Sequence, residues 1–305
     1  MLDLNYVRIV FSLLTTCMIL LGSLVNTFEK YIPVIFSQAL RYGKFSHKGR
    51  PLFIVIEVPK AWFRHFYVYS FVLTTATLVF LSAVFVFKVE VPVFVYDVLD
   101  LVGGSFRLAS ISNTSAFVGM SLLTLQCCRR FYDTLFVSVF SKSGRMNIAQ
   151  YLAGYFHYSG CILAILLETS KFVRNTSLGA DLHWEDLGLK DAFAVVLFLW
   201  AWKHQYNVTV ILANLRKNKK GNVVTEAHGL PHGDWFDYVS SPHILAELLM
   251  YIALTVILWG NVTWLYIFSW VLTNQVETAL LTHWWYKDNF SNIPKNRKAI
   301  IPYIY

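Results

Sequence analysis

Apolar residues recur along the chain in seven stretches of about 20 residues, separated by shorter polar connections. A helix needs about 20 mainly apolar residues to cross the roughly 30 Å hydrocarbon core of a bilayer. The pattern therefore predicts an all-α polytopic membrane protein with about seven transmembrane helices in a single domain, residues 1–305. The predicted helices cover residues 6–25, 67–88, 108–127, 147–168, 190–213, 243–260 and 263–282.

The composition agrees with a membrane protein. Of the 305 residues, 56% are hydrophobic and 14% are charged, and the mean hydropathy is +0.50. Soluble domains carry about 25% charged residues, so these values argue against an ordinary soluble domain. The four cysteines lie in or beside apolar stretches without the spacing typical of zinc ligands, and no metal site is predicted.

Basic residues are concentrated in alternate connections. The formal net charge is +8, and lysines and arginines gather within residues 26–66, 129–145, 216–220 and 287–298. Short loops rich in lysine and arginine face the cytosol. The connection 26–66 and the C-terminus are therefore predicted to be cytosolic. Because the charge follows membrane topology, no nucleic-acid partner is predicted.

Polar residues interrupt the apolar pattern most densely between residues 190 and 305. An ionisable side chain inside a bilayer costs about 2.5–3.5 kcal/mol on insertion scales, so several in neighbouring helices indicate a site. We expect this region to form a cavity that is open to the cytosol and binds a large polar ligand. Interhelical hydrogen bonding alone is the structural alternative. The candidate residues are Gln205, Arg216, Lys217, Tyr238, His243, Glu247, His283 and Tyr286.

One further acidic residue, Glu57, is flanked by apolar residues in the sequence FIVIEVP (53–59). Burial disfavours a charged carboxylate, so these neighbours predict a desolvated group that can donate a proton. The alternative is a solvated loop carboxylate. No G-x-G-x-x-G sequence opens a helix, so a dinucleotide would bind between membrane helices and loops and not on a Rossmann unit.

Several motifs resemble the steroid 5α-reductase family. They are NLRK (214–217), GDWFDYVSSP (233–242), LAE (245–247) and PKNRKAIIP (294–302). Within this family, the segments RYGK (41–44), VPK (58–60), FVSVFS (136–141) and HQY (204–206) resemble the polyprenol reductase branch more closely than the steroid enzymes. The resemblance extends over most of the chain and is weakest before residue 35.

This resemblance implies a reductase of the endoplasmic reticulum membrane that uses NADPH from the cytosolic side. The region 190–305 would bind the cofactor, and Glu57 matches the acidic position that faces the substrate oxygen. Two departures stand out, because His243 replaces the usual asparagine and Thr209 stands where steroid enzymes carry aspartate. Cofactor-contacting positions carried over from the family are Gln205, Arg216, Tyr238, His243, Glu247, His283 and Tyr286; Lys217 is predicted beside Arg216 as a phosphate ligand.

The implied chemistry is the saturation of a carbon–carbon double bond by hydride. Hydride adds to the β-carbon only when the alkene is conjugated to an electron-withdrawing group, so an α,β-unsaturated aldehyde is expected and an allylic alcohol is not. For this branch the substrate would be the polyisoprenoid lipid polyprenal, on the route from polyprenol to the dolichol used in protein N-glycosylation. Glu57 would hydrogen-bond the carbonyl oxygen as charge develops there.

Alternatives from other classes remain open at this stage. A 3-oxo-5α-steroid 4-dehydrogenase or an enoyl-thioester reductase of the same family would use the same cofactor. A membrane methyltransferase of related architecture would bind S-adenosylmethionine instead. A non-catalytic lipid-binding or scaffolding protein would tolerate Glu57→Gln and Arg216→Ala without loss of function.

Overall fold

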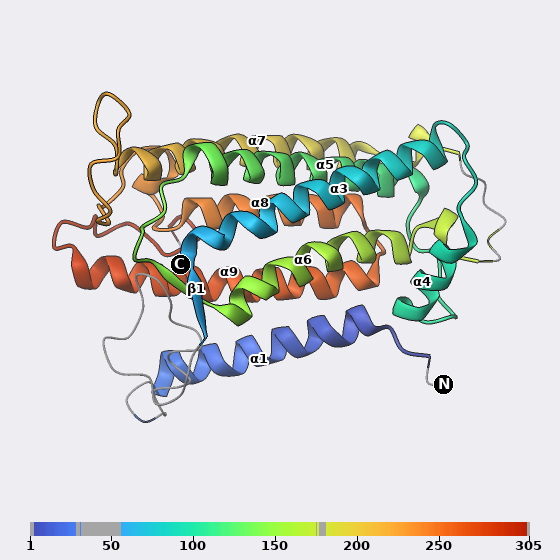
Figure 1. Cartoon of the computed structure of the whole chain (residues 1–305), viewed down its shortest axis with the longest axis horizontal. Coiled ribbons are helices and arrows are strands. Elements are labelled where there is room, and N and C mark those ends of the chain that lie inside the picture. Colours follow the sequence, from blue (N-terminus) through green and yellow to red (C-terminus); the bar gives the residue numbers. More distant parts are fainter. Residues whose placement is uncertain (1–2, 29–30, 32–55, 175, 177–180, 304–305) are drawn as a thin grey trace.

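Seven long helices form the body of the part of the protein that the structure describes (Figure 1). The computed structural model describes residues 3–28, 31, 56–174, 176 and 181–303. Every predicted apolar stretch coincides with one of these helices, so the predicted all-α class is confirmed. The long helices are α1 (Tyr6–Phe28), α3 (Phe63–Phe85), α5 (Asn113–Tyr132), α6 (Ile148–Leu167), α7 (Leu189–Asn214), α8 (Pro242–Ile257) and α9 (Val262–Asn289).

Polar side chains fix where several helices begin. Ser112 Oγ accepts a hydrogen bond from Ser115 N (3.1 Å) in front of α5. Asn147 and Asn261 cap α6 and α9 in the same way. Such caps satisfy backbone N–H groups that have no partner within the helix. Pro242 occupies the first position of α8, where its missing N–H costs nothing.

Short elements connect the helices. Strand β1 (Glu57–Pro59) pairs antiparallel with β2 (Arg145–Asn147), and Glu57 lies opposite Asn147. The remaining pieces are the single turns η2 (Lys60–Trp62), η3 (Asp133–Val137), η4 (Ser170–Phe172), η5 (Trp184–Asp186) and η6 (Asp234–Asp237). Of the predicted connection 26–66, residues 32–55 with the 41–44 motif lie outside the described part. Its last residues belong to β1, η2 and the start of α3.

Two segments in the described part are long and apolar enough to cross a membrane on length and composition alone. They are Tyr6–Val25 and Lys60–Phe85. Other long helices carry more polar residues; α7, for example, contains the run Lys203, His204 and Gln205. Seven crossings therefore stay a prediction.

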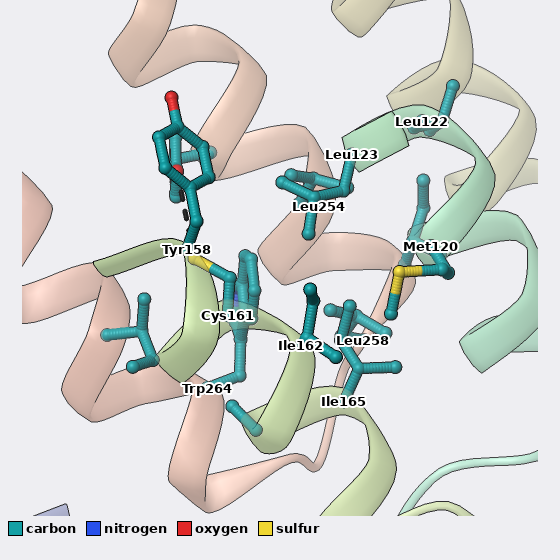
Figure 2. Packing of buried hydrophobic residues seen from close by; sticks show 14 of the residues in the cluster. Met120, Leu122, Leu123, Tyr158, Cys161, Ile162, Ile165, Leu254, Leu258 and Trp264 are labelled. Atoms are coloured by element: carbon teal, nitrogen blue, oxygen red, sulfur yellow. Dashed lines mark hydrogen bonds between the residues drawn. The ribbon is translucent and has the colours of Figure 1, made fainter. Parts of the chain in front are cut away.

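The hydrophobic core joins α5, α6, α8 and α9 (Figure 2). Trp264 of α9 is fully buried, its Nε1 donates to Thr255 Oγ1 (3.0 Å), and its ring stacks on Tyr251. Gly119 of α5 leaves room for Leu258, because a Cβ there would lie 2.9 Å from Leu258 Cδ2. Close packing of this kind holds the helices that carry the candidate residues in a fixed arrangement.

Glu168 ties together four segments at the end of the bundle opposite β1. Its carboxylate follows α6 and accepts hydrogen bonds from Ser110 Oγ (2.6 Å), Thr263 N (2.7 Å) and Val262 N (2.9 Å). Arg8 of α1 completes the set with an ion pair at 3.0 Å. A carboxylate with these donors also compensates the positive N-terminal end of α9.

The sequence did not predict α4 (Val93–Gly103), a helix of 11 residues at this same end. Asp100 of α4 forms ion pairs with Arg107 (2.5 Å) and Arg174 (2.7 Å). Arg107 is buried and also donates to Leu167 O (2.9 Å). The paired charges thus fasten α4 to the bundle.

We expect Asp100→Asn to destabilise this end by about 3 kcal/mol, because it leaves the buried Arg107 without a counter-charge. Burial raises the pKa of Asp100, but Arg107 and Arg174 lower it by more, so the folded-state pKa lies below the ordinary 3.8. The stabilisation is therefore complete above that ordinary pKa and disappears as the pH falls through the folded-state value. Thermal unfolding of the two proteins against pH checks both statements.

Asp97→Asn is the matched control, because Asp97 pairs with Arg174 on the exposed side of the same helix. An exposed pair contributes at most about 1 kcal/mol. Equal unfolding midpoints for Asp100→Asn and the parent protein would contradict the assigned role.

Candidate functional site

The predicted cofactor residues lie toward one end of the bundle, where α7 ends, α8 begins and α9 ends (Figure 1). Strand β1 and the C-terminus lie at the same end. The basic segments 129–145, 216–220 and 287–298 also belong to it, because α5, α7 and α9 all end there. The structure thus gathers segments that are up to 170 residues apart into one region, where the side chains form three groups.

The first group is a buried polar layer between α5 and α7. Gln205 Oε1 accepts hydrogen bonds from Gln126 Nε2 (2.9 Å) and from Arg129 Nη2. Arg129 also donates to Gln126 Oε1 (2.9 Å) and to Asp133 Oδ2 (2.7 Å). All four side chains are buried. A buried arginine needs such a counter-charge and acceptors to offset its lost hydration.

The same layer continues to α8 through the other side of the Gln205 amide. Gln205 Nε2 donates to His243 O (2.8 Å) and to Glu247 Oε2 (3.2 Å). The structure therefore brings three predicted residues together. Because both the oxygen and the nitrogen of this amide are engaged by the protein, Gln205 fits a positioning role better than direct contact with a ligand.

Arg130 extends this layer towards α3. Its Nη2 donates to Tyr67 OH (3.0 Å), and its guanidinium lies 4.7 Å from the centre of the Tyr67 ring. The sequence pattern places Arg129 and Arg130 in a connection after the helix, but both lie in the last turn of α5. The spacing of Gln126, Arg129, Arg130 and Asp133 on one helical face is the signal that could have found them.

We expect Gln205→Leu to lower the free energy of unfolding by about 3 kcal/mol, because buried donors on Gln126 and Arg129 lose their acceptor. Thermal unfolding in detergent measures the effect. Asn214→Leu, at the exposed end of the same helix, is the control and should leave the midpoint unchanged. A Gln205→Leu protein with the same unfolding midpoint as the parent would show that the hydrogen bonds of the Gln205 amide do not stabilise the buried polar layer.

The second group contains Arg216 and Lys217, just beyond α7. Arg216 Nη1 donates to Val139 O (2.6 Å), and Lys217 Nζ donates to Val137 O (3.2 Å). Burial lowers the pKa of Arg216 by more than the nearby Glu226 raises it, so this pKa lies below its ordinary value. Since Arg216 follows Gln205 by 11 residues, about 16 Å of helix separates the first two groups.

The third group joins the end of α9 to the segment 233–241. His283 Nδ1 lies 2.8 Å from Ser240 Oγ, and Ser240 N donates to Lys298 O (2.8 Å). The buried ring of Tyr286 packs against Phe290. Tyr238 is half exposed, and its ring lies 6.1 Å from that of Tyr303.

Arg297 belongs to the third group and was missed as a site residue. Its side chain is 2% exposed, yet only Nη2 has an acceptor in the described part, Pro231 O at 3.1 Å. The buried Nε and Nη1 have no hydrogen-bond partner among the described residues. Burial lowers the pKa of Arg297 by more than Tyr286 and Asp237 raise it, so this pKa lies below its ordinary value. An arginine stays protonated, so these donors suit an anion.

Glu57 lies apart from the three groups. Its side chain is exposed, and within the described part it forms no hydrogen bond or ion pair. The predicted desolvation is therefore wrong for this fold. Side chains alternate along a strand, and in β1 the neighbouring Val58 is the buried one. Its role at the substrate oxygen stays a prediction.

These groups fit a dinucleotide in two respects. Cationic centres at Arg216–Lys217 and at Arg297 could hold phosphates, and Arg297 has two buried donors, without a partner among the described residues, that could donate to phosphate oxygens. A half-open cavity of about 670 Å³ lies at the opposite end of the bundle, beside Arg8, Arg107 and Glu168. It does not coincide with the candidate residues.

Comparison with known proteins shows the family to which the chain belongs. A family model described as 3-oxo-5-alpha-steroid 4-dehydrogenase matches residues 145–305. The chain is 40% identical over 305 residues to a polyprenal reductase from Drosophila melanogaster, covering 98% of this chain and 93% of that protein. It is 33% identical over 280 residues to a polyprenal reductase from Homo sapiens, covering 89% and 86% of the two chains. A Caenorhabditis elegans polyprenal reductase is 32% identical over 266 residues.

Proposed function

Since the chain belongs to the 3-oxo-5-alpha-steroid 4-dehydrogenase family, we propose that it uses NADPH to saturate the α,β-double bond of polyprenal. The observation that carries the proposal is the similarity to polyprenal reductases over nearly the whole chain. The pathway outcome would be the conversion of polyprenol to dolichol, which supports protein N-glycosylation.

The long helices would cross the endoplasmic reticulum membrane seven times. The end that carries Arg216, Lys217 and Arg297 would face the cytosol, because short basic connections remain on that side. A bilayer around the bundle suits a substrate with a long isoprenoid tail, since the tail can stay in lipid while its aldehyde reaches the site. The apolar segments Tyr6–Val25 and Lys60–Phe85 support this arrangement.

The cofactor would be held by the three groups of the candidate site. Arg216, Lys217 and Arg297 would bind its phosphates, because an arginine fork matches phosphate oxygens. His283, Tyr286 and Tyr238 would contact the remainder from α9 and from the segment 233–241. When bound, NADPH supplies the hydride.

The buried layer would fix the geometry of this site. Gln205 links α5 to α8 through Arg129, His243 and Glu247. Its hydrogen bonds hold the ends of three helices in register without requiring contact with the reacting atoms. Precise positioning of this kind supplies a large part of a rate enhancement, because small displacements from the reactive geometry are costly.

Glu57 would act on the carbonyl oxygen of the substrate. An aldehyde conjugated to the double bond draws electron density towards its oxygen as the β-carbon is reduced. A hydrogen bond from the Glu57 position, once bound substrate covers this exposed side chain, would stabilise that developing charge. An allylic alcohol has no oxygen that can accept this charge, so polyprenol is not the expected substrate.

A substrate panel tests the proposal. The purified protein in lipid vesicles is given NADPH or NADH together with polyprenal, a 4-ene-3-oxo steroid or an enoyl thioester, and cofactor oxidation is followed. We expect turnover with NADPH and polyprenal. Turnover of the steroid alone would assign the chain to the activity named by its family, and no turnover of any compound would contradict a reductase.

A further inference from the structure

The short helix α4 presents an apolar face that no other described part of the protein covers. Phe94 and Leu101 are 66% and 67% exposed, and Val93 and Val98 are exposed beside them. Their spacing places these four residues on one side of the helix. The opposite side carries the buried Leu99, which packs into the core.

This face continues on both sides of α4. Phe106 and Leu108 are exposed in the loop that follows, and Phe87 is exposed just before α4, after the end of α3. Lys60–Phe85 is a segment long and apolar enough to cross a membrane. In Figure 1, α4 lies at the end of the bundle where α3 ends, away from β1 and the C-terminus. The apolar surface therefore begins where α3 would leave the hydrocarbon core.

Several charged side chains on and beside this face have partners. Asp97 and Asp100 form ion pairs with Arg174, and Asp100 also pairs with Arg107. Asp97 lies on the same side of the helix as Val93 and Leu101, and the Asp3 carboxylate accepts hydrogen bonds from Ser105 N and Phe106 N in the loop after α4. Because these carboxylates have partners, they can lie among lipid headgroups while the neighbouring apolar side chains reach the acyl chains.

We propose that α4 is an interfacial anchor that lies in the non-cytosolic surface of the bilayer, with Val93, Phe94, Val98, Leu101, Phe106 and Leu108 in contact with lipid acyl chains. Eleven residues make about 16 Å of helix, roughly half of a bilayer core. An amphipathic helix of this kind lies in the plane of the interface. The inference rests on the proposed membrane architecture and adds to it a contact that is not a crossing.

Photocrosslinking tests the anchor in the full chain. A diazirine amino acid is placed at Phe94 or at Leu101, and the protein is reconstituted in phosphatidylcholine vesicles and illuminated. Val79 of α3, 64% exposed, is the control for a lipid-facing position, and Val224, 62% exposed in the connection after α7, is the control for water. Mass spectrometry identifies what each position has captured.

We expect phospholipid adducts at positions 79, 94 and 101 and water adducts at position 224. Water adducts at positions 94 and 101, or adducts to a second copy of the chain, would overturn the anchor when position 79 still captures lipid. Water adducts at position 79 in addition to positions 94 and 101 would overturn both the anchor and the proposed membrane architecture. Reduction of polyprenal by the same labelled proteins is measured in parallel and tests the proposed activity separately.

Discussion

Replacing Arg297 by alanine should raise the KM for NADPH by about two orders of magnitude, which corresponds to ~3 kcal/mol. Its Nε and Nη1 are buried and have no protein partner in the described structure. Such donors cost free energy unless a ligand accepts from them. The loss should therefore appear mainly as weaker cofactor binding, measured as the KM for NADPH and as the Kd by calorimetry.

Two further variants separate binding from folding. Lys295→Ala removes a positive charge from the same segment at an exposed position and should leave the KM within about twofold, since exposed charges contribute little. Arg297→Lys keeps the charge but loses the planar fork and should fall between the two. An Arg297→Ala protein that unfolds normally and binds NADPH as tightly as its parent would exclude Arg297 from the cofactor site.

Replacing Glu57 by glutamine should lower kcat for polyprenal by about 100-fold while leaving the KM for NADPH unchanged. The expected size is that of removing one preorganised group that stabilises charge on an oxygen in the transition state. An amide keeps the shape of the side chain and can still donate a weak hydrogen bond, but it cannot transfer a proton. Single-turnover kinetics at saturating NADPH measure the chemical step directly.

Glu90→Gln is the matched control, because Glu90 is also exposed but lies between α3 and α4, at the opposite end of the bundle. It should retain full activity. If Glu57→Gln is equally active, the exposed carboxylate of β1 belongs to the protein surface. The group that polarises the aldehyde must then be sought elsewhere, for example at the Tyr67–Arg130 pair.

The long helices could be predicted because a helix buried in either protein or lipid has the same sequence pattern, a run of about 20 apolar residues. The short α4 lacks this pattern, since Asp97 and Asp100 interrupt its 11 residues. Only the fold reveals that Arg107, in the loop after α4, and the distant Arg174 neutralise both carboxylates. The length and composition of a segment thus predict a helix reliably only when no distant partner changes its charge balance.

The candidate site was harder to predict for the same reason. Polar residues within apolar runs, such as Gln205 and Glu247, indicated a site, and the structure joins them. Arg297 stands in a polar tail where nothing local predicts burial, and Glu57 has apolar neighbours that do not bury it. In both cases the environment depends on which segment packs alongside, and that information is absent from the local sequence.

The most direct test of the central claim is to follow deuterium from NADPH labelled at the transferable hydrogen. The purified protein in lipid vesicles is given polyprenal or polyprenol, and the products are analysed by mass spectrometry. We predict a saturated aldehyde with one deuterium on its β-carbon from polyprenal, and no saturated product from polyprenol. Direct saturation of polyprenol would contradict the electronic argument, and the absence of label in any lipid product would contradict the reductase itself.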